Sequence, residues 1–484
     1  MPKYFFCIWL FLQNHLEKKL EKRRNINYNK NRSKKRRNGA SAQECADALF
    51  LCFPEGETFY LLGINFIWEC GNSMEIENSE QRLRCQLEKL STFTSTPGNG
   101  VTRFPFTPEA HEASLYIRKC MEEIGLAVRL DNSGSVIGRL EGQISDTVMI
   151  GSHLDSVKSG GAYDGIAGVM CGIEAVRLFQ KSGEKPYYSI EVIATNDEEG
   201  SRFKSGLFTG KVLDAQLSVE DIRRYIDAEG ISVYDAMKAY GLEPDEIASH
   251  KRTDIKAFLE VHIEQGPILE AEKKDIGVVD IIVGIKRALV TVNGRADHIG
   301  TMPMNMRMDA MEAASKVIAQ IGDRARNYPL AVATVGNLNV EPNIVNIIPS
   351  KVVYSVDFRG TTQDVIDAQY QGMLEDLKAV TERFHMNFEV KETLNVVPVE
   401  LSEDFRSYIE ESCAAHGYSN MHIVSGAGHD AQVFGARIPA AMVFVPSIGG
   451  RSHCPEEATD ERTLAMAAVV ACDTLKKISK EKRL

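Results

Sequence analysis

Hydrophobic and polar residues change their pattern at about residue 74. From there on, apolar residues recur at helical spacing, first at Leu83, Leu87 and Leu90 and then over residues 113–124. Side chains three and four positions apart share one face of a helix, so this spacing predicts two amphipathic helices. The working fold is therefore expected to begin near residue 74.

The segment before residue 74 has a different character. A short apolar run over residues 4–12 is followed by a strongly basic stretch over residues 18–37. A secretory signal has the opposite order, because its positive charge precedes its apolar run. We therefore expect residues 1–73 to be a disordered extension, or one that does not belong to the natural protein.

Strand and helix patterns alternate from residue 145 onward. Apolar runs at residues 147–152 and 189–195 predict buried strands, and the apolar periodicity of residues 165–180 between them predicts a helix. This order is typical of a parallel α/β sheet, whose ligands gather at the carboxyl ends of the strands. Another apolar run, at residues 440–445, predicts that the sheet continues near the end of the chain.

The pattern changes again between residues 284 and 397. Two predicted strands and two predicted helices fall in this interval, at residues 288–292, 351–358, 308–321 and 362–384. Such a mixture predicts a compact α+β domain. We expect it to be inserted into a larger domain made of residues 74–283 and 398–484.

Composition narrows the classes of function. The formal net charge of the 484 residues is -11, which gives no basic surface for nucleic acid. Beyond the first dozen residues, no apolar run approaches the roughly 20 residues that a membrane-spanning helix needs. The 10 cysteines are scattered without a C-x-x-C pair, as is typical of reduced thiols. We expect a cytoplasmic protein that binds neither nucleic acid nor membrane.

Potential metal ligands follow the first predicted strand. His153 and Asp155 are two residues apart, and a carboxylate so placed can orient a metal-bound imidazole. An unrelated turn is the alternative for this pair. Asp164 follows a glycine-rich loop and could bridge two cations through its two oxygens, or simply cap the next helix.

The second predicted strand ends in three acids, Asp197, Glu198 and Glu199. Clustered carboxylates raise each other's pKa unless cations neutralise them. A surface loop is the alternative, but the apolar strand before them favours a cleft. Two more histidines, His262 and His453, each follow an apolar run. Histidines with carboxylates suit Zn²⁺, and also Mn²⁺ or Co²⁺.

In this order, these elements resemble those of the hydantoinase/carbamoylase amidases, which include N-carbamoyl-L-amino-acid hydrolases, allantoate amidohydrolases and β-ureidopropionases. The resemblance covers residues 74–484. It implies an α/β fold in which a dinuclear-metal, aminopeptidase-like catalytic domain carries an inserted α+β domain, residues 284–397, for closing the site and for dimerisation. It also implies a homodimer with two divalent metal ions per subunit, Zn²⁺ before Mn²⁺ or Co²⁺.

The same resemblance implies roles for individual residues. The implied metal ligands are His153, Asp164 as the bridging ligand, Glu199, His262 and His453. The implied catalytic residues are Glu198 as general base, Asp155 as the orienting carboxylate, and His298 as a stabiliser of the oxyanion from the partner subunit. The implied substrate-binding residues are Gln265, Asn346 and Arg359, the last of which can hold a carboxylate with two hydrogen bonds.

Residues 296–304 resemble the lid motif in the inserted domain of the family, but two positions depart from it. Ile299 and Met302 stand where the family usually carries alanine and threonine, which bears on lid packing and substrate preference, whereas His298 is retained. A cleft loop of the family is matched at residues 425–431. His429 of this loop is left outside the ligand set, because a structural or substrate-lining role explains it equally well.

The expected activity is metal-dependent cleavage of a C–N bond in a linear ureido substrate with a carboxylate, releasing ammonia and carbon dioxide. An N-carbamoyl-L-amino acid is slightly favoured over allantoate. One alternative is a related metal-dependent aminoacylase or dipeptidase, which would share the metals and the fold. The other alternative is a non-catalytic binding protein of the same fold. The presence of Glu198 and of all five implied ligands argues against this alternative.

Overall fold

The computed structural model describes the backbone of residues 58–482 and the side chains of residues 74–482. The chain divides into two compact units, Met1–Cys70 and Gly71–Leu484, and the second contains the features discussed below. The expectation for residues 1–57 lies outside the described residues. Residues 58–73 form the first part of helix α3 (Thr58–Ser91). Within residues 58–482, no helix has both the length and the apolar character needed to cross a membrane.

A nine-stranded sheet forms the centre of the Gly71–Leu484 unit. The strand order is β1-β2-β4-β3-β5-β13-β6-β11, with β12 paired to β6. The strands are β1 (Ala127–Leu130), β2 (Val136–Leu140), β3 (Ile144–His153), β4 (Tyr188–Thr195), β5 (Ile255–Ile263), β6 (Ile276–Ile282), β11 (Val399–Glu400), β12 (Asn420–Ser425) and β13 (Ala440–Val445).

The sheet is mixed, whereas the sequence predicts a parallel one. Strands β4, β3, β5 and β13 run parallel to their neighbours in this central part. Antiparallel pairs flank them, because the hairpin β1-β2 adds to β4 on one side and β6 pairs antiparallel with β13 on the other. The carboxyl ends of the four central strands therefore still lie along one edge.

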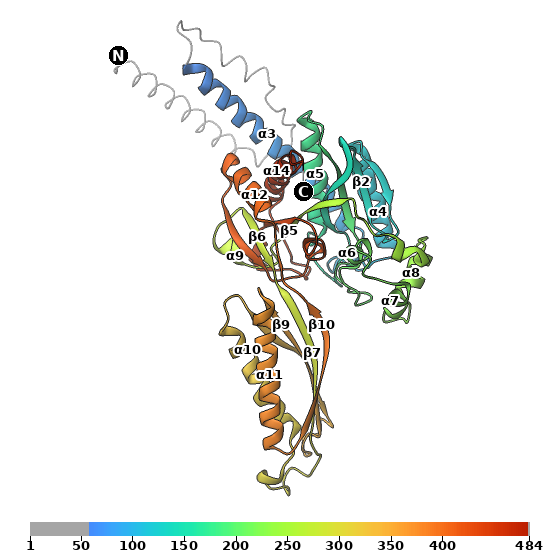
Figure 1. Cartoon of the computed structure of the whole chain (residues 1–484), viewed down its shortest axis with the longest axis vertical. Helices are drawn as coiled ribbons and strands as arrows, with labels where there is room; N and C mark the ends of the chain where they lie inside the picture. Colours follow the sequence, from blue (N-terminus) through green and yellow to red (C-terminus); the bar gives the residue numbers. More distant parts are fainter. Residues whose placement is uncertain (1–57, 483–484) are drawn as a thin grey trace, which may run out of the picture. The chain divides into compact units, whose positions relative to one another are not determined.

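Helices cover both faces of this sheet (Figure 1). The face that carries Val148 and Ile150 packs against the larger helices, which are α3, α4 (Pro108–Glu123), α5 (Ile166–Lys181), α12 (Glu403–His416) and α14 (Glu461–Ile478). The face that carries Met149 and Phe258 packs against short helices, which are α6 (Phe208–Leu213), α9 (Ile268–Ala271) and α13 (Asp430–Gly435). Burial on both faces explains why these strands are continuously apolar.

A smaller apolar cluster lies around Phe203 and Phe208. It includes residues of three short helical elements, α7 (Val219–Arg224), α8 (Val233–Ala239) and η1 (Pro244–Ser249). Two further short turns of 3-10 helix are η2 (Met304–Met306) and η3 (Ile448–Gly450).

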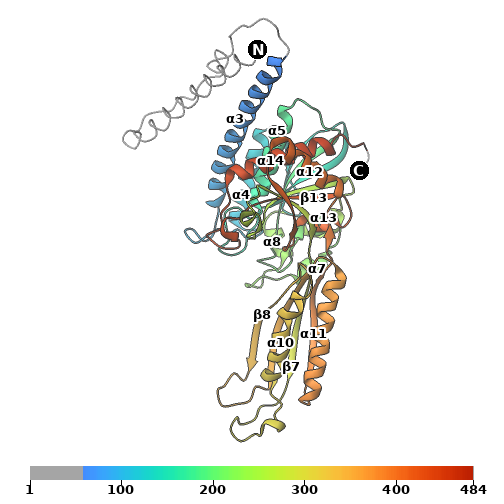
Figure 2. The same ribbon diagram turned by 90° about the vertical axis from the view of Figure 1, so that its left-hand side faces the viewer.

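A second, four-stranded antiparallel sheet has the order β10-β7-β9-β8. Its strands are β7 (Gly284–Asn293), β8 (Val332–Glu341), β9 (Lys351–Gly360) and β10 (Asn387–Val396). Helices α10 (Ala310–Arg326) and α11 (Gln363–Arg383) cover one face, on which Val290 and Tyr354 are buried. Figure 2 shows both helices beside this sheet. The sheet and its two helices are called the lid below.

Candidate metal centre

Two histidines meet at the carboxyl ends of neighbouring parallel strands. His153 is the last residue of β3, and His262 lies next to the last residue of β5. Because parallel strands end at the same edge, the two imidazole rings come together, and their Nε2 atoms are 3.3 Å apart. Both side chains are buried.

The carboxylate of Asp164 lies between two groups of ligand side chains. Its Oδ1 atom is 3.7 Å from Nε2 of His153 and 3.2 Å from Nε2 of His262. Its Oδ2 atom is 3.1 Å from Nε2 of His453, which in turn is 3.3 Å from Oε1 of Glu199. Each oxygen of one carboxylate thus faces a separate group. The structure brings all five predicted ligands together.

The donor set fits divalent cations. Oδ1 of Asp164 and Oε1 of Glu199 are buried and have no hydrogen-bond partner within the part of the chain that the structure describes. An unsatisfied buried acceptor is costly unless a cation or water reaches it. Imidazole nitrogens and carboxylate oxygens are the usual ligands of Zn²⁺, and three protein ligands per group leave a position open for water or substrate.

Several residues in and next to the candidate metal centre have unusual backbone conformations. Asp197, Gln265 and His453 have positive φ angles of 57°, 60° and 56°, which non-glycine residues adopt rarely and mainly at functional sites. Gly165 has a φ of 67°, and a Cβ atom at this position would lie 2.4 Å from the ring of His153. Only glycine leaves room for that ring.

Glu457 is a buried carboxylate that the sequence does not single out. Its Oε1 atom accepts hydrogen bonds from the backbone N–H groups of Tyr163 at 3.1 Å and Asp164 at 3.0 Å. The hydroxyl of Ser452 donates to its Oε2 atom at 2.7 Å. Glu457 therefore ties the loop of Asp164 to the loop that carries His453. A contact across 293 positions of the chain leaves no local signal in the sequence.

Asp155 makes contacts at the site through its backbone carbonyl oxygen and through its side-chain carboxylate. Nδ1 of His153 lies 3.0 Å from the backbone carbonyl oxygen of Asp155 but 3.9 Å from its carboxylate. The carboxylate instead accepts the backbone N–H groups of Glu198 at 3.1 Å and Glu199 at 3.2 Å. Burial raises the pKa of Asp155 to about 6, although a charge on His153 opposes this. Its carbonyl orients the imidazole, and its side chain fixes the acidic turn.

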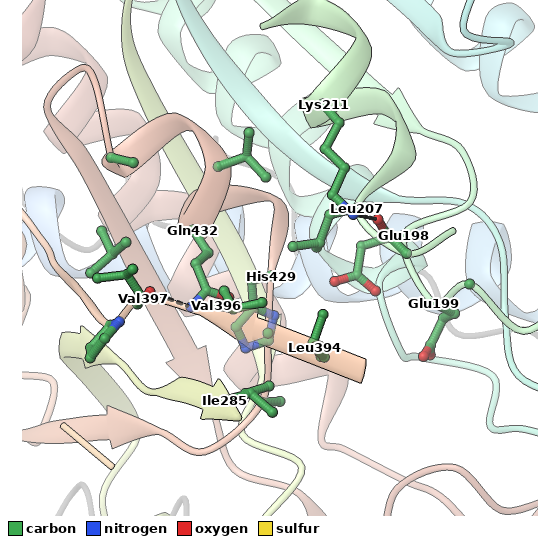
Figure 3. A pocket seen from close by; sticks show the side chains of 18 of the residues that line it. Glu198, Glu199, Leu207, Lys211, Ile285, Leu394, Val396, Val397, His429 and Gln432 are labelled. Atoms are coloured by element: carbon green, nitrogen blue, oxygen red, sulfur yellow. Dashed lines mark hydrogen bonds between the residues drawn. The ribbon is translucent and has the colours of Figure 1, made fainter. Parts of the chain in front are cut away.

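Glu198 lies beside the predicted metal ligands and lines the cavity above them. Figure 3 shows its carboxylate beside that of Glu199 at the wall of the pocket, and its Oε2 atom is 4.0 Å from Nε2 of His153. Burial raises the pKa of Glu198 well above its usual range; a charge on His153 opposes this shift, and the charge of Glu199 adds to it. A raised pKa suits a carboxyl group that takes a proton and returns it.

A cavity of about 1250 Å³ opens over these side chains, large enough for a small-molecule substrate. The catalytic part of the chain contributes His153, Glu198, Glu199, His262, Gln265 and His453 to its lining. The lid contributes Ile285, Arg287, Arg359 and residues 393–396. Gln265 reaches the cluster directly, because its amide Nε2 donates to Oδ2 of Asp164 at 3.1 Å.

Two predicted site residues lie elsewhere in this chain. His298 and Asn346 are exposed on the lid and do not line the cavity. They are close to each other, since His298 forms a β-bridge with Ile347. Arg359 does line the cavity, where its Nε donates to Asp357 at 2.9 Å.

His429 is a further histidine at the cavity (Figure 3). Its ring centre is 4.6 Å from that of His262, and its Nε2 atom is 2.8 Å from the Ser425 hydroxyl. Burial lowers the pKa of His429 well below its usual range, so the ring is neutral. The sequence indicates that the loop of His429 matters but does not separate a structural role from a substrate-lining one. In the structure, His429 lies at the wall of the cavity.

Fold and site together define a metal-dependent hydrolase of the aminopeptidase-like class. An aminopeptidase of Bacillus cereus shares the fold, with a TM-score of 0.61 at 18% identity. Residues 149–477 match the Peptidase family M20/M25/M40, and this chain belongs to that family.

Within the family, the chain is similar to amidohydrolases. It is 36% identical over 405 residues to the N-carbamoyl-L-amino-acid amidohydrolase of Paenarthrobacter aurescens, covering 83% of this chain and 98% of that protein. It is 37% identical over 396 residues to the allantoate amidohydrolase of Escherichia coli (strain K12), covering 81% and 96%.

A hydantoinase/carbamoylase family amidase from Burkholderia multivorans has a solved structure that matches with a TM-score of 0.76 at 30% identity, covering 83% of this chain and 98% of that one. The family resemblance and the fold class predicted from the sequence are confirmed.

Proposed function

We propose that this protein is a metal-dependent amidohydrolase that cleaves a C–N bond of a linear ureido substrate bearing a carboxylate, with release of ammonia and carbon dioxide. The observation that carries the proposal is the carboxylate of Asp164, whose two oxygens face two groups of ligands beneath a cavity. The names of the similar amidohydrolases, which refer to N-carbamoyl-L-amino acids and allantoate, support this substrate class.

The proposed metal content is two divalent cations per chain, Zn²⁺ before Mn²⁺ or Co²⁺. His153 and His262 would hold one, Glu199 and His453 the other, and Asp164 both. When bound, such cations lower the pKa of a water molecule and polarise a substrate carbonyl.

Glu198 is the proposed general base. Its carboxylate takes a proton from the attacking water and returns it to the leaving nitrogen. The hydrogen bonds from the backbone of residues 198 and 199 to Asp155 hold the turn in place during both transfers. No covalent intermediate with the protein is needed.

Arg359 and Gln265 are the proposed substrate-binding residues within one chain. Arg359 binds the substrate carboxylate, for which its planar guanidinium is suited. Gln265, whose amide lies 3.2 Å from Nε2 of His453, binds the ureido end beside the metal ligands.

The remaining site residues are proposed to act across a homodimer. Strand β8 is an edge strand of the lid sheet, and Val332 and Leu338 on it are exposed. An uncovered edge with apolar side chains is a surface for pairing with a second chain. The lid of one subunit would then bring His298, for the oxyanion, and Asn346 to the cavity of its partner. The free cysteines, such as Cys171 and Cys413, support a cytoplasmic location.

The test is ammonia release by the metal-loaded protein from N-carbamoyl-L-amino acids, N-carbamoyl-β-alanine and allantoate, with amine release from N-acetyl amino acids measured in parallel. Ammonia from a ureido substrate is the expected result. Amine release from the acetyl compounds alone would replace the proposal with an aminoacylase.

A further inference from the structure

A second arginine, Arg287, stands beside Arg359 on the lid sheet. In the antiparallel pair of β7 and β9, Arg287 is opposite Asp357 and Ile285 is opposite Arg359. These four side chains therefore share one face of the sheet. It is the face away from α10 and α11, which pack on the alternate residues such as Ala288 and Phe358.

One carboxylate holds both guanidinium groups. Oδ2 of Asp357 accepts from Nε of Arg287 at 2.6 Å, and Oδ1 accepts from Nε of Arg359 at 2.9 Å. The two charges on either side hold the pKa of Asp357 below its usual range, although burial opposes this. Asp357 thus stays ionised and fixes the orientation of both side chains.

The two guanidinium groups differ in the donors that they have left. Arg359 also donates through Nη1 to the carbonyl oxygen of Gly426 at 2.5 Å and through Nη2 to Asp357 at 3.5 Å. Arg287 uses only its Nε, and within residues 74–482 its two terminal nitrogens have no hydrogen-bond partner. The Arg287 side chain is 48% exposed, against 25% for Arg359. Both line the cavity.

Several basic side chains line the cavity. Outside the predicted metal ligands and Glu198, the ionised side chains of the lining are Lys204, Lys211, Arg287 and Arg359, against a single acid, Glu400. Figure 3 shows Lys211 on the same side of the pocket as Glu198. With Asp357 and an ionised Glu198 included, these four basic groups face three acidic ones, so the wall has no excess of negative charge that would repel a substrate anion at Arg287.

We propose that Arg287 binds a second carboxylate, carried on the side chain of the substrate, so that the preferred substrates are ureido derivatives of dicarboxylic amino acids. This inference rests on the proposed function. Arg287 and Arg359 are diagonal neighbours on adjacent strands, about 7–8 Å apart at the backbone. Their long side chains converge on Asp357 and present two separate anion sites at the short spacing that a small diacid requires. The free planar edge of Arg287 suits a carboxylate bound through two parallel hydrogen bonds.

The test compares N-carbamoyl-L-glutamate with N-carbamoyl-L-glutamine, which has nearly the same shape without the second charge. We expect kcat/KM to be about tenfold to a hundredfold higher for the glutamate derivative, as for a hydrogen bond between charged groups. Arg287→Met is expected to remove this preference, so that the ratio of kcat/KM for the two derivatives falls to about one. Arg326→Met, which breaks a similar pair with Asp323 on α10 (2.6 Å) away from the cavity, is the matched control.

Equal kcat/KM for the two derivatives, or a preference that survives Arg287→Met, would overturn the role of Arg287 and leave the proposed function standing. Binding of L-glutamate and L-glutamine to the metal-loaded protein, measured by calorimetry, separates the two proposals. A glutamate preference in binding that Arg287→Met removes, together with no turnover of any ureido compound, would overturn the proposed function alone.

Discussion

Asp164 is the residue through which the two groups of ligands are related. Its carboxylate oxygens lie 3.2 Å from His262 and 3.1 Å from His453, on segments far apart in the sequence. Two neighbouring residues hold Asp164 in position. Glu457 accepts a hydrogen bond from its backbone N–H group, and Gln265 donates one to its carboxylate. Asp164 itself supplies charge, whereas these neighbours set where the charge lies.

The first prediction concerns Glu198. Glu198→Gln keeps the size of the side chain but removes its ability to accept a proton, so kcat is expected to fall by about 10²–10⁴-fold. The metal content, measured by elemental analysis, is expected to stay at the wild-type value, because Glu198 is not one of the five predicted ligands. Wild-type turnover of this variant would remove Glu198 from the role of base.

The second prediction concerns Glu457. Glu457→Ala removes the acceptor of the two backbone N–H groups at Tyr163 and Asp164. Residues that orient metal ligands typically contribute 10-fold to 100-fold to metal affinity, so a loss of about that size is expected in a competition with a coloured chelator. Glu456→Ala is the control, because within residues 74–482 the side chain of Glu456 pairs only with the exposed Arg451. Equal affinity of both variants would exclude a positioning role.

At the scale of elements, the site lies at the carboxyl ends of the central strands. These central strands are also the parts of the fold that the sequence predicts best. β3, β4 and β13 are buried on both faces, so their apolar runs predict them to within a few residues. Strands β8 and β10 escape prediction because many of their residues are exposed and carry no continuous apolar run. The flanking antiparallel strands also escape it, since pairing direction leaves no local signal.

The third prediction concerns a link between elements. Arg103 is buried, and its guanidinium donates to the carbonyl oxygens of Leu154 at 2.6 Å, Leu90 at 3.0 Å and Phe93 at 3.3 Å. It thereby ties the end of α3 to the residue that follows His153. Burial lowers its pKa to about 10, against the charge of Asp155, so the group stays charged at neutral pH.

Arg103→Met leaves the carbonyl oxygens of Leu154 and Phe93 without their donor, whereas that of Leu90 still accepts from the backbone N–H of Phe93 at 3.2 Å. Each unsatisfied buried group costs about 1–3 kcal/mol. We expect the free energy of unfolding, measured with urea, to fall by about 2–4 kcal/mol. Arg103→Lys, which restores some of the donors, is expected to lose less. A change within about 0.5 kcal/mol for Arg103→Met, as at an ordinary surface position, would contradict this account.

At the scale of the whole molecule, the cavity draws residues from both sheets, yet His298 and Asn346 stay on the exposed part of the lid. The sequence predicts the ligands because their motifs are local. The role of Asp155 and the contribution of Glu457 depend on contacts that form only in the fold. In the proposed function, the part played by the lid depends on a second chain, which is a contact that the sequence of one chain does not show.

The fourth prediction tests that dependence. If His298 acts in the cavity of the partner, then mixing inactive Glu198→Gln and inactive His298→Ala chains restores one complete site in each mixed dimer. Roughly a quarter of the wild-type rate is expected after random subunit exchange. A mixture of Glu198→Gln with His262→Ala is expected to stay inactive, because both residues belong to the same site. Absence of rescue in the first mixture, with mixed dimers demonstrated, would contradict the assignment.

The most direct test of the central claim is a metal titration of the chelator-treated protein, with ammonia release from an N-carbamoyl-L-amino acid as the readout. The two groups of ligands that share Asp164 predict no activity without metal and a rate that reaches its plateau at about two divalent cations per chain. Full activity in the metal-free protein, or a plateau at one cation per chain, would contradict a dinuclear amidohydrolase.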